Sequence, residues 1–168
     1  PAVNVLSGFS VTEMIEAGKI VGPRSYGSPV MTCGGWSPWR NIDTYEDAQN
    51  AINWQTNLGV ISIKDYKQCT RIQRTWIAEA SRKNNLTLTS EGSDLDYLLG
   101  LVMTGHAGWE HPLQIYPIYS DVAKFFGQAK AHYSSQLLIS DYPVGSAIEY
   151  WYGENDLLQD EKLMYWNP

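Results

Sequence analysis

Signals for the start of a helix recur along this chain at nearly constant spacing, and this feature limits the possible folds more than any other. Thr44, Thr70, Ser93 and Ser120 each precede a segment with apolar residues at helical spacing, and they lie 26, 23 and 27 residues apart. A hydroxyl at this position accepts a hydrogen bond from a free amide of the first helical turn. Short apolar strands fit between these helices at residues 60–64, 86–89 and 107–110. The alternation predicts βαβ units around a parallel sheet, an α/β fold.

Further elements extend this pattern at both ends. We expect a short helix over Val11–Ala17, a strand over Ser25–Met31 and a later strand over Ser134–Ile139. Thr70 with Gln73 forms a capping-box pattern. The predicted buried face of the helix that follows consists of Ile72, Trp76, Ile77 and Ala80.

Three polar residues stand where successive strands end. Lys64 closes the first strand, Glu91 follows the second, and His111 ends the third. The carboxyl ends of parallel strands meet at one edge of the sheet, about 5 Å apart per strand. α/β folds place ligand and metal groups at this edge. We therefore expect the three side chains to converge on one rim.

Composition excludes several functions. The 168 residues suit a single domain, and the net charge of −6 leaves no basic stripe for nucleic acid. No apolar run approaches the 18 residues of a membrane span, so we expect a soluble protein of the cytoplasm or periplasm. Cys33 and Cys69 are far apart without a CxxC spacing. We interpret them as two buried or free thiols rather than a disulfide framework.

Several segments together carry a family resemblance. They are Glu16–Arg24, Gly59–Tyr66, Ser90–Ser93, Gly105–His111 and Tyr150–Asn155. In this order they resemble the amidohydrolase superfamily, in particular the imidazolonepropionase- and prolidase-like members found behind a TolB-like β-propeller domain. The resemblance implies a (β/α)8 TIM-type barrel with helices on its outer face. It also implies hydrolysis of C–N bonds, in an amide or cyclic amide, of a small-molecule or peptide-like substrate.

The resemblance also implies a divalent-metal site, usually zinc. In the family the ligands are an HxH pair on strand 1, a lysine (often carboxylated) on strand 4, histidines on strands 5 and 6, and an aspartate on strand 8. Lys64 matches the strand-4 lysine and His111 matches the strand-6 histidine. Glu91 stands where the strand-5 histidine is expected, and a carboxylate also binds zinc or a harder divalent ion. Tyr66, just after Lys64, is a candidate for substrate contact.

The chain lacks other parts of the family pattern. It contains no HxH motif, and no residue aligns with the strand-8 aspartate. A complete barrel needs about 200 to 250 residues. We therefore interpret residues 1–168 as one incomplete barrel domain, roughly strands three to seven, that is inactive or nearly so alone. The alternative is a non-catalytic α/β module that closes its open sheet by forming a homo-oligomer. A doubly wound flavodoxin-like sheet, with helices on both faces, is the competing fold.

Each candidate residue also has a structural interpretation. Lys64 could pair with Asp65 or Glu91, and Glu91 could instead stabilise the dipole of the helix that begins near Ser93. His111 could be a structural hydrogen bonder. The other two histidines are expected to be structural, His106 at the opposite end of the strand from His111 and His132 at the end of a helix.

Overall fold

The elements alternate along the chain as expected. The computed structural model describes residues 6–31, 33, 41–66, 69–92, 94–113, 115 and 117–135, and the single residues 159, 161 and 165. The helices are α1 (Leu6–Glu16), α2 (Tyr45–Asn57), α3 (Arg71–Lys83), α4 (Leu95–Thr104) and α5 (Ser120–Gln128). The strands are β1 (Val30–Met31), β2 (Ser62–Asp65), β3 (Thr87–Glu91), β4 (Gly108–Glu110) and β5 (His132–Ser134).

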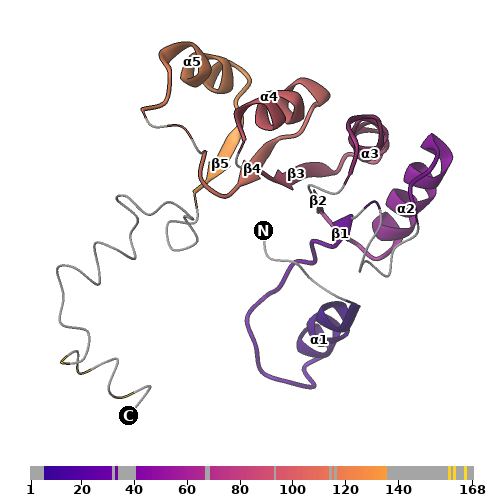
Figure 1. Cartoon of the computed structure of the whole chain (residues 1–168). Helices are drawn as coiled ribbons and strands as arrows, with labels where there is room; N and C mark the ends of the chain where they lie inside the picture. Colours follow the sequence, from indigo (N-terminus) through magenta and orange to yellow (C-terminus); the bar gives the residue numbers. More distant parts are fainter. Residues whose placement is uncertain are drawn as a thin grey trace.

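The five strands form one parallel sheet in the order β1-β2-β3-β4-β5. Each strand lies beside its neighbour in sequence, whereas a doubly wound sheet reverses its strand order at a switch point. Figure 1 shows the strands in a curved row with α2 to α5 on its convex side, while α1 lies apart from this helical layer. The arrangement is that of a partial (β/α)8 barrel, and the prediction of the fold class is confirmed.

Local sequence explains where two of the helices begin. Thr44 Oγ1 accepts a hydrogen bond from the Asp47 amide at 3.1 Å, and the Asp47 carboxylate accepts one from the Thr44 amide at 2.9 Å. Thr70 and Gln73 form the same reciprocal pair. The expected cap at Ser120 is wrong, because Ser120 is already helical and Tyr119 takes the cap position without a side-chain bond.

Two apolar clusters lie between the helices and the sheet. The first joins α2 and α3 to β1, β2 and β3 and includes Met31, Ile52, Ile63 and Ile77, all fully buried. The second joins α4 and α5 to β4 and includes Leu98, Leu101, Trp109 and Phe126. Apolar burial on the helical side leaves the other face of the sheet for polar side chains.

The structure corrects the predicted face of α3. Ile72, expected to be buried, is 54% exposed, while Arg74 is buried. Arg74 Nη1 donates a hydrogen bond of 2.7 Å to the Cys69 carbonyl, and the guanidinium carbon lies 4.3 Å from the centre of the Tyr97 ring. These partners come from a loop and from α4, so the periodicity of α3 alone did not reveal them.

Two strands and one histidine also differ from expectation. β1 covers only the last two residues of the predicted strand, Val30 and Met31. The strand after α5 starts earlier, at His132 rather than at Ser134. His132 was expected to end a helix, but α5 ends at Gln128 and His132 is the first residue of β5.

The two cysteines form a disulfide bond, which overturns the expectation of free thiols. Cys33 follows β1, Cys69 precedes α3, and their Cα atoms lie 4.8 Å apart although 36 residues separate them in sequence. Since β1 and β2 are adjacent in the sheet, the chain segments that leave them run side by side. The disulfide therefore joins two loops at the carboxyl edge of the sheet.

Some expectations fall outside the described residues. They concern most of the predicted strand 134–139 and the segment Tyr150–Asn155 of the family resemblance. The expected cap at Ser93 is wrong, because Asp94 takes the cap position of α4 without a side-chain hydrogen bond. Within the part of the chain that is described, no helix is both long and apolar enough to cross a membrane.

Candidate active site at the carboxyl edge of the sheet

Strand β2 presents different side chains to the two faces of the sheet. Ile63 packs in the cluster under α2 and α3, and Asp65 contacts His106 from the segment between α4 and β4. Because side chains alternate along a strand, Ser62 and Lys64 point to the opposite, helix-free face. This face is the interior of a barrel.

A buried ion pair spans the helix-free face. Lys64 Nζ lies 2.7 Å from Oε2 of Glu110 on β4, and only 4% and 3% of the two side chains are exposed. The lysine side chain crosses β3 to reach its partner. Neither of the pairings expected from sequence, with Asp65 or Glu91, is the direct contact.

The environment of Lys64 affects its protonation. Burial lowers the pKa of the ammonium below that of an exposed lysine, while the charges of Glu91 and Asp65 act in the opposite direction. A lowered pKa makes the neutral amine more accessible, and the neutral amine is the form that can react with carbon dioxide.

Glu91 and His111 form a second pair on the same rim. His111 Nε2 lies 2.6 Å from Glu91 Oε1, and about a fifth of each side chain is exposed. The His111 backbone has φ = 80°, a left-handed conformation that few non-glycine residues adopt. Its amide donates a 3.0 Å hydrogen bond to the Ser134 carbonyl of β5. The chain thus turns at the end of β4, and the imidazole lies against β3.

Tyr66 lies close to both pairs. Its ring centre is 5.1 Å from Lys64 Nζ. Burial raises the pKa of its hydroxyl, and the charge of Glu91 raises it further. The rim therefore brings together all the residues that the sequence singled out, Lys64, Tyr66, Glu91 and His111. To these the structure adds Glu110, which sequence reasoning missed.

Register could have revealed Glu110. Glu91 pairs with Glu110 across β3 and β4, so both carboxylates stand at the same level of the sheet. The sequence interpretation ended the strand at Glu110, as the structure does, but it considered only His111, the next residue, as a site residue. Trp109 packs against Phe126 of α5 with ring centres 4.6 Å apart. Its two neighbours in β4, Gly108 and Glu110, therefore face the barrel interior.

The rim contains side chains of the kind that bind divalent metals. An imidazole and carboxylates are suitable donors for zinc, and Glu91 Oε2 is buried without a hydrogen-bond partner in the described part of the chain. However, no three His, Cys, Asp or Glu side chains among these residues are placed to hold a metal ion. Lys64 contacts Glu110 as an ion pair. The set fits a partial site rather than a complete one.

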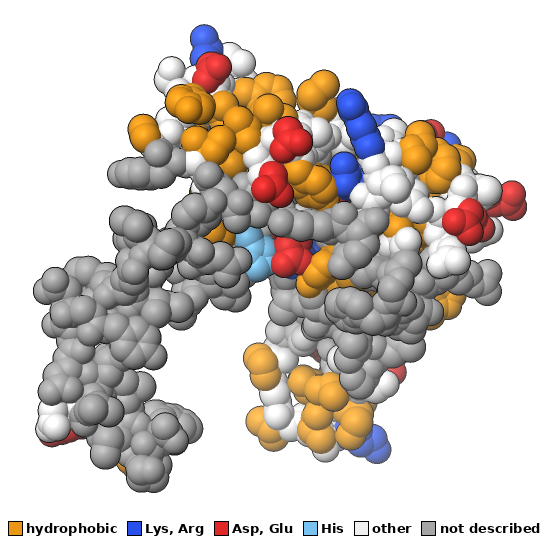
Figure 2. All heavy atoms as spheres, viewed as in Figure 1, with side chains coloured by type: hydrophobic (Ala, Val, Ile, Leu, Met, Phe, Trp, Pro, Cys, Tyr) orange, Lys and Arg blue, Asp and Glu red, His pale blue; other side chains and the backbone are white. Residues whose placement is uncertain are grey.

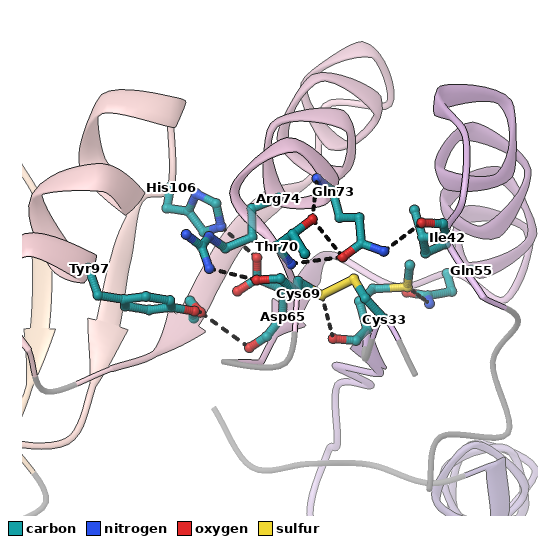
Figure 3. Close-up of a disulfide and its surroundings, with 12 residues drawn as sticks. Cys33, Ile42, Gln55, Asp65, Cys69, Thr70, Gln73, Arg74, Tyr97 and His106 are labelled. Carbon is teal, nitrogen blue, oxygen red and sulfur yellow. Dashed lines mark hydrogen bonds and ion pairs between the residues drawn. A yellow bond between two sulfur atoms is a disulfide. The ribbon is translucent and has the colours of Figure 1, made fainter. Parts of the chain in front are cut away.

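A second polar cluster lies on the helical side of the sheet. His106 Nε2 is 2.8 Å from Asp65 Oδ2, and both side chains are fully buried. The other ring nitrogen lies 3.1 Å from the Leu101 carbonyl and 3.0 Å from Thr104 Oγ1. Figure 3 shows His106 beside Asp65 near the disulfide. These contacts are all within the fold and agree with the structural role expected for His106.

Comparison with known proteins identifies the fold but no sequence family. No protein-family model matches this chain, and no curated protein matches it. Among solved structures, ochratoxinase from A. niger matches with a TM-score of 0.63 and 16% identity over 88% of this chain and 42% of its own. A prolidase complexed with N-methylphosphonate-L-proline matches with a TM-score of 0.62 and 17% identity, over 77% of this chain and 40% of its own. A Xaa-Pro dipeptidase matches with a TM-score of 0.60 and 14% identity, over 78% of this chain and 40% of its own.

The structural neighbours are enzymes of the amidohydrolase superfamily with TIM-barrel folds. At these sequence identities the likeness shows the fold alone. The class that the fold defines is therefore the partial (β/α)8 barrel. This chain spans about two-fifths of the length of the enzymes it matches.

Proposed function

We propose that this chain forms part of the active site of a metal-dependent hydrolase that cleaves an amide C–N bond. The observation that carries the proposal is the position of the polar cluster. Lys64, Glu91, Glu110 and His111 meet on the interior face, at the carboxyl ends of parallel strands. TIM-barrel enzymes place their active sites at this end of the barrel.

In this proposal Lys64, Glu91 and His111 are the metal ligands. Zinc bound at the rim would activate a water molecule and polarise the substrate carbonyl. His111 and Glu91 already face one another. Lys64 would bind the metal after carboxylation of its amine, which the lowered pKa of the ammonium favours. Tyr66, beside both pairs, would contact the substrate.

The remaining ligands would come from strands outside those described. The described sheet has five strands, whereas a closed barrel has eight. We propose that further barrel strands, in the same polypeptide or in a second copy, complete the metal site. The substrate class proposed here is a small N-acyl amino acid or dipeptide. Its support is the shared fold with a prolidase and a Xaa-Pro dipeptidase.

A hydrolysis assay tests this assignment. The chain is purified without chelators, supplied with zinc and incubated with Xaa-Pro dipeptides and N-acyl amino acids. We expect slow zinc-dependent release of the amino acid, which Glu91→Gln abolishes and the exposed Lys124→Ala leaves unchanged. Turnover at the usual 1 to about 1000 per second would contradict the incompleteness of the site. Zinc-dependent release that persists unchanged in Glu91→Gln would contradict the catalytic role assigned to this rim.

The alternative function is a non-catalytic module that self-associates. Its support is that β1 and β5 are the outer strands of the described sheet, and an open sheet edge can pair with another chain. Sedimentation equilibrium tests it. A stable dimer without bound metal would favour this alternative over the hydrolase.

The disulfide bears on the compartment. Disulfides persist in oxidising compartments and are rare in the reducing cytosol. Of the two locations considered from sequence, we propose the periplasm, supported by the Cys33–Cys69 bond. Mass spectrometry of alkylated protein from fractionated cells checks this, and free thiols in the native protein would contradict it.

A further inference from the structure

A cavity of about 300 Å³ lies at the amino edge of the sheet, where the strands begin. Its walls come from the last turns of α3 and from the turns that lead into β3 and β4. We propose that this cavity binds a small aliphatic carboxylate, whose charge is recognised by Arg82. Strand β3 runs from the cavity at Thr87 to the rim at Glu91, a distance of about 13 Å. The inference therefore concerns a second site and goes beyond the proposed function.

The two edges of the sheet differ in charge. The last residue of each of β2, β3 and β4 is acidic, and Figure 2 shows an acidic side chain next to a histidine in the hollow below the helical layer. The segments that lead into β3, β4 and β5 contain no acidic residue over positions 82–86, 104–107 and 129–131. They contain the cations Arg82, Lys83 and Lys130. In a chain of net charge −6, the amino edge is therefore the more favourable of the two for an anion.

Arg82 is the charged residue of the cavity wall, and its side chain has no counter-ion among the described residues. Its Nη1 atom lies 3.9 Å from the position that a Cβ atom on Gly105 would occupy, so the guanidinium reaches from α3 to the end of α4. The neighbouring Lys83 is engaged elsewhere, because its Nζ donates a 2.7 Å hydrogen bond to the Tyr45 hydroxyl and lies 3.4 Å from Glu79 Oε1. A guanidinium presents a planar pair of donors that matches the two oxygens of a carboxylate.

The backbone acceptors around the cavity are already used, whereas side-chain donors remain. The last carbonyls of α3 accept hydrogen bonds from the amides of residues 84–86, and those of α4 accept from the amides of residues 105 and 106. This capping reduces the repulsion that two helix carboxyl ends exert on an anion. Ser81, in the cavity wall, has a buried hydroxyl without a hydrogen-bond partner in the described chain. Asn85 and Thr87 are exposed and add an amide and a hydroxyl. A ligand that supplies acceptors complements these groups.

The remaining wall is apolar and favours a carboxylate over a more highly charged anion. Ala78, Leu86, Leu88 and Ala107 line the cavity beside the polar groups. They can contact a short hydrocarbon body, which inorganic phosphate lacks. One guanidinium also balances the single charge of a carboxylate, whereas phosphate carries up to two charges near neutral pH.

Nuclear magnetic resonance of the backbone amides, titrated with butyrate, tests the proposal. Butyramide, the neutral analogue, and inorganic phosphate are the comparison probes. We expect butyrate to bind saturably at millimolar concentrations and to move the signals of Gly105 and Ala107. Butyramide should bind about tenfold more weakly or worse, because it lacks the charge-assisted hydrogen bonds. No saturable shift with butyrate, or saturable binding of phosphate alone, would overturn the proposal.

Variants at two adjacent cations provide a matched comparison. Arg82→Gln should weaken butyrate binding by about tenfold or more. Lys83→Gln removes the same charge one position further along α3 and should bind like the wild type. Unchanged affinity in Arg82→Gln, or an equal loss in both variants, would overturn the proposal. Both side chains are exposed, and circular dichroism establishes that the variants are folded.

Ser81→Ala separates ligand binding from fold stability. The variant removes a hydroxyl that has no partner in the described chain, so it should weaken butyrate binding without lowering the melting temperature. The titrations need neither zinc nor hydrolysis. Butyrate binding by a chain that takes up no zinc would refute the metal site but support this cavity. Zinc uptake that depends on His111, without butyrate binding, would refute the cavity but support the metal site.

Discussion

Lys64 and Glu110 meet across an intervening strand, with Nζ and Oε2 2.7 Å apart and both side chains almost completely buried. β2 and β4 are not neighbours in the sheet, since β3 lies between them. The pair thus links three strands on the interior face. A buried ion pair is costly to desolvate, and its presence at the carboxyl edge is more readily explained by chemistry at this site than by stability.

Removing one partner of this pair should destabilise the fold strongly. Lys64→Met leaves the Glu110 carboxylate buried without its cation, and we expect a loss of about 3–5 kcal/mol in the free energy of unfolding. The double variant Lys64→Met/Glu110→Gln should recover a large part of this loss. Urea denaturation followed by tryptophan fluorescence measures the free energy of unfolding of the single and the double variant. Lys124→Met, at an exposed position, is the control, and a Lys64→Met effect as small as the control would contradict the buried pair.

The disulfide should stabilise the fold because it closes a loop and so restricts the unfolded chain. For residues 36 apart, the entropy of loop closure predicts a stabilisation of about 4 kcal/mol. Reduction should therefore lower the melting temperature of the wild type measured by calorimetry. The double variant Cys33→Ala/Cys69→Ala should melt at the lower temperature with or without reductant. An identical melting curve for the wild type before and after complete reduction would show that the bond is not formed.

Alkaline pH should weaken the fold partly through Tyr97. Burial raises the pKa of this hydroxyl above its usual 10, with the charge of Asp65 acting in the same direction. A raised pKa in the folded state contributes stability that is present below pH about 10 and is lost as the pH rises through the folded-state value. Tyr97→Phe should therefore lose less unfolding free energy than the wild type between pH about 9 and about 11. Equal losses in the two proteins, measured by urea denaturation at each pH, would contradict this.

Sequence reasoning succeeded where local rules decide the structure. The helix cap at Thr44 and the capping box of Thr70 with Gln73 depend on residues within one helical turn, and both form as expected. The parallel order of β2, β3 and β4 followed from the regular spacing of these elements. The common rim of Lys64, Glu91 and His111 then followed from the geometry of a parallel sheet.

It failed where partners come from distant segments. The bond between Cys33 and Cys69 depends on the adjacency of β1 and β2, which the spacing of two cysteines does not reveal. The Lys64–Glu110 pair depends on the register of three strands and on the length of a lysine side chain. The burial of Arg74 depends on the Cys69 carbonyl and on Tyr97 of another helix. Local periodicity contains none of this information.

We propose that the rim around Lys64, Glu91 and His111 binds a catalytic metal, and the metal content of the purified protein can be measured. Elemental mass spectrometry is applied to protein purified without chelators, to His111→Ala and to His132→Ala as a matched histidine control. We expect zinc in the wild type and in His132→Ala, and its loss in His111→Ala. Wild-type protein without bound metal, or zinc that persists in His111→Ala, would contradict the assignment of this rim as the metal site.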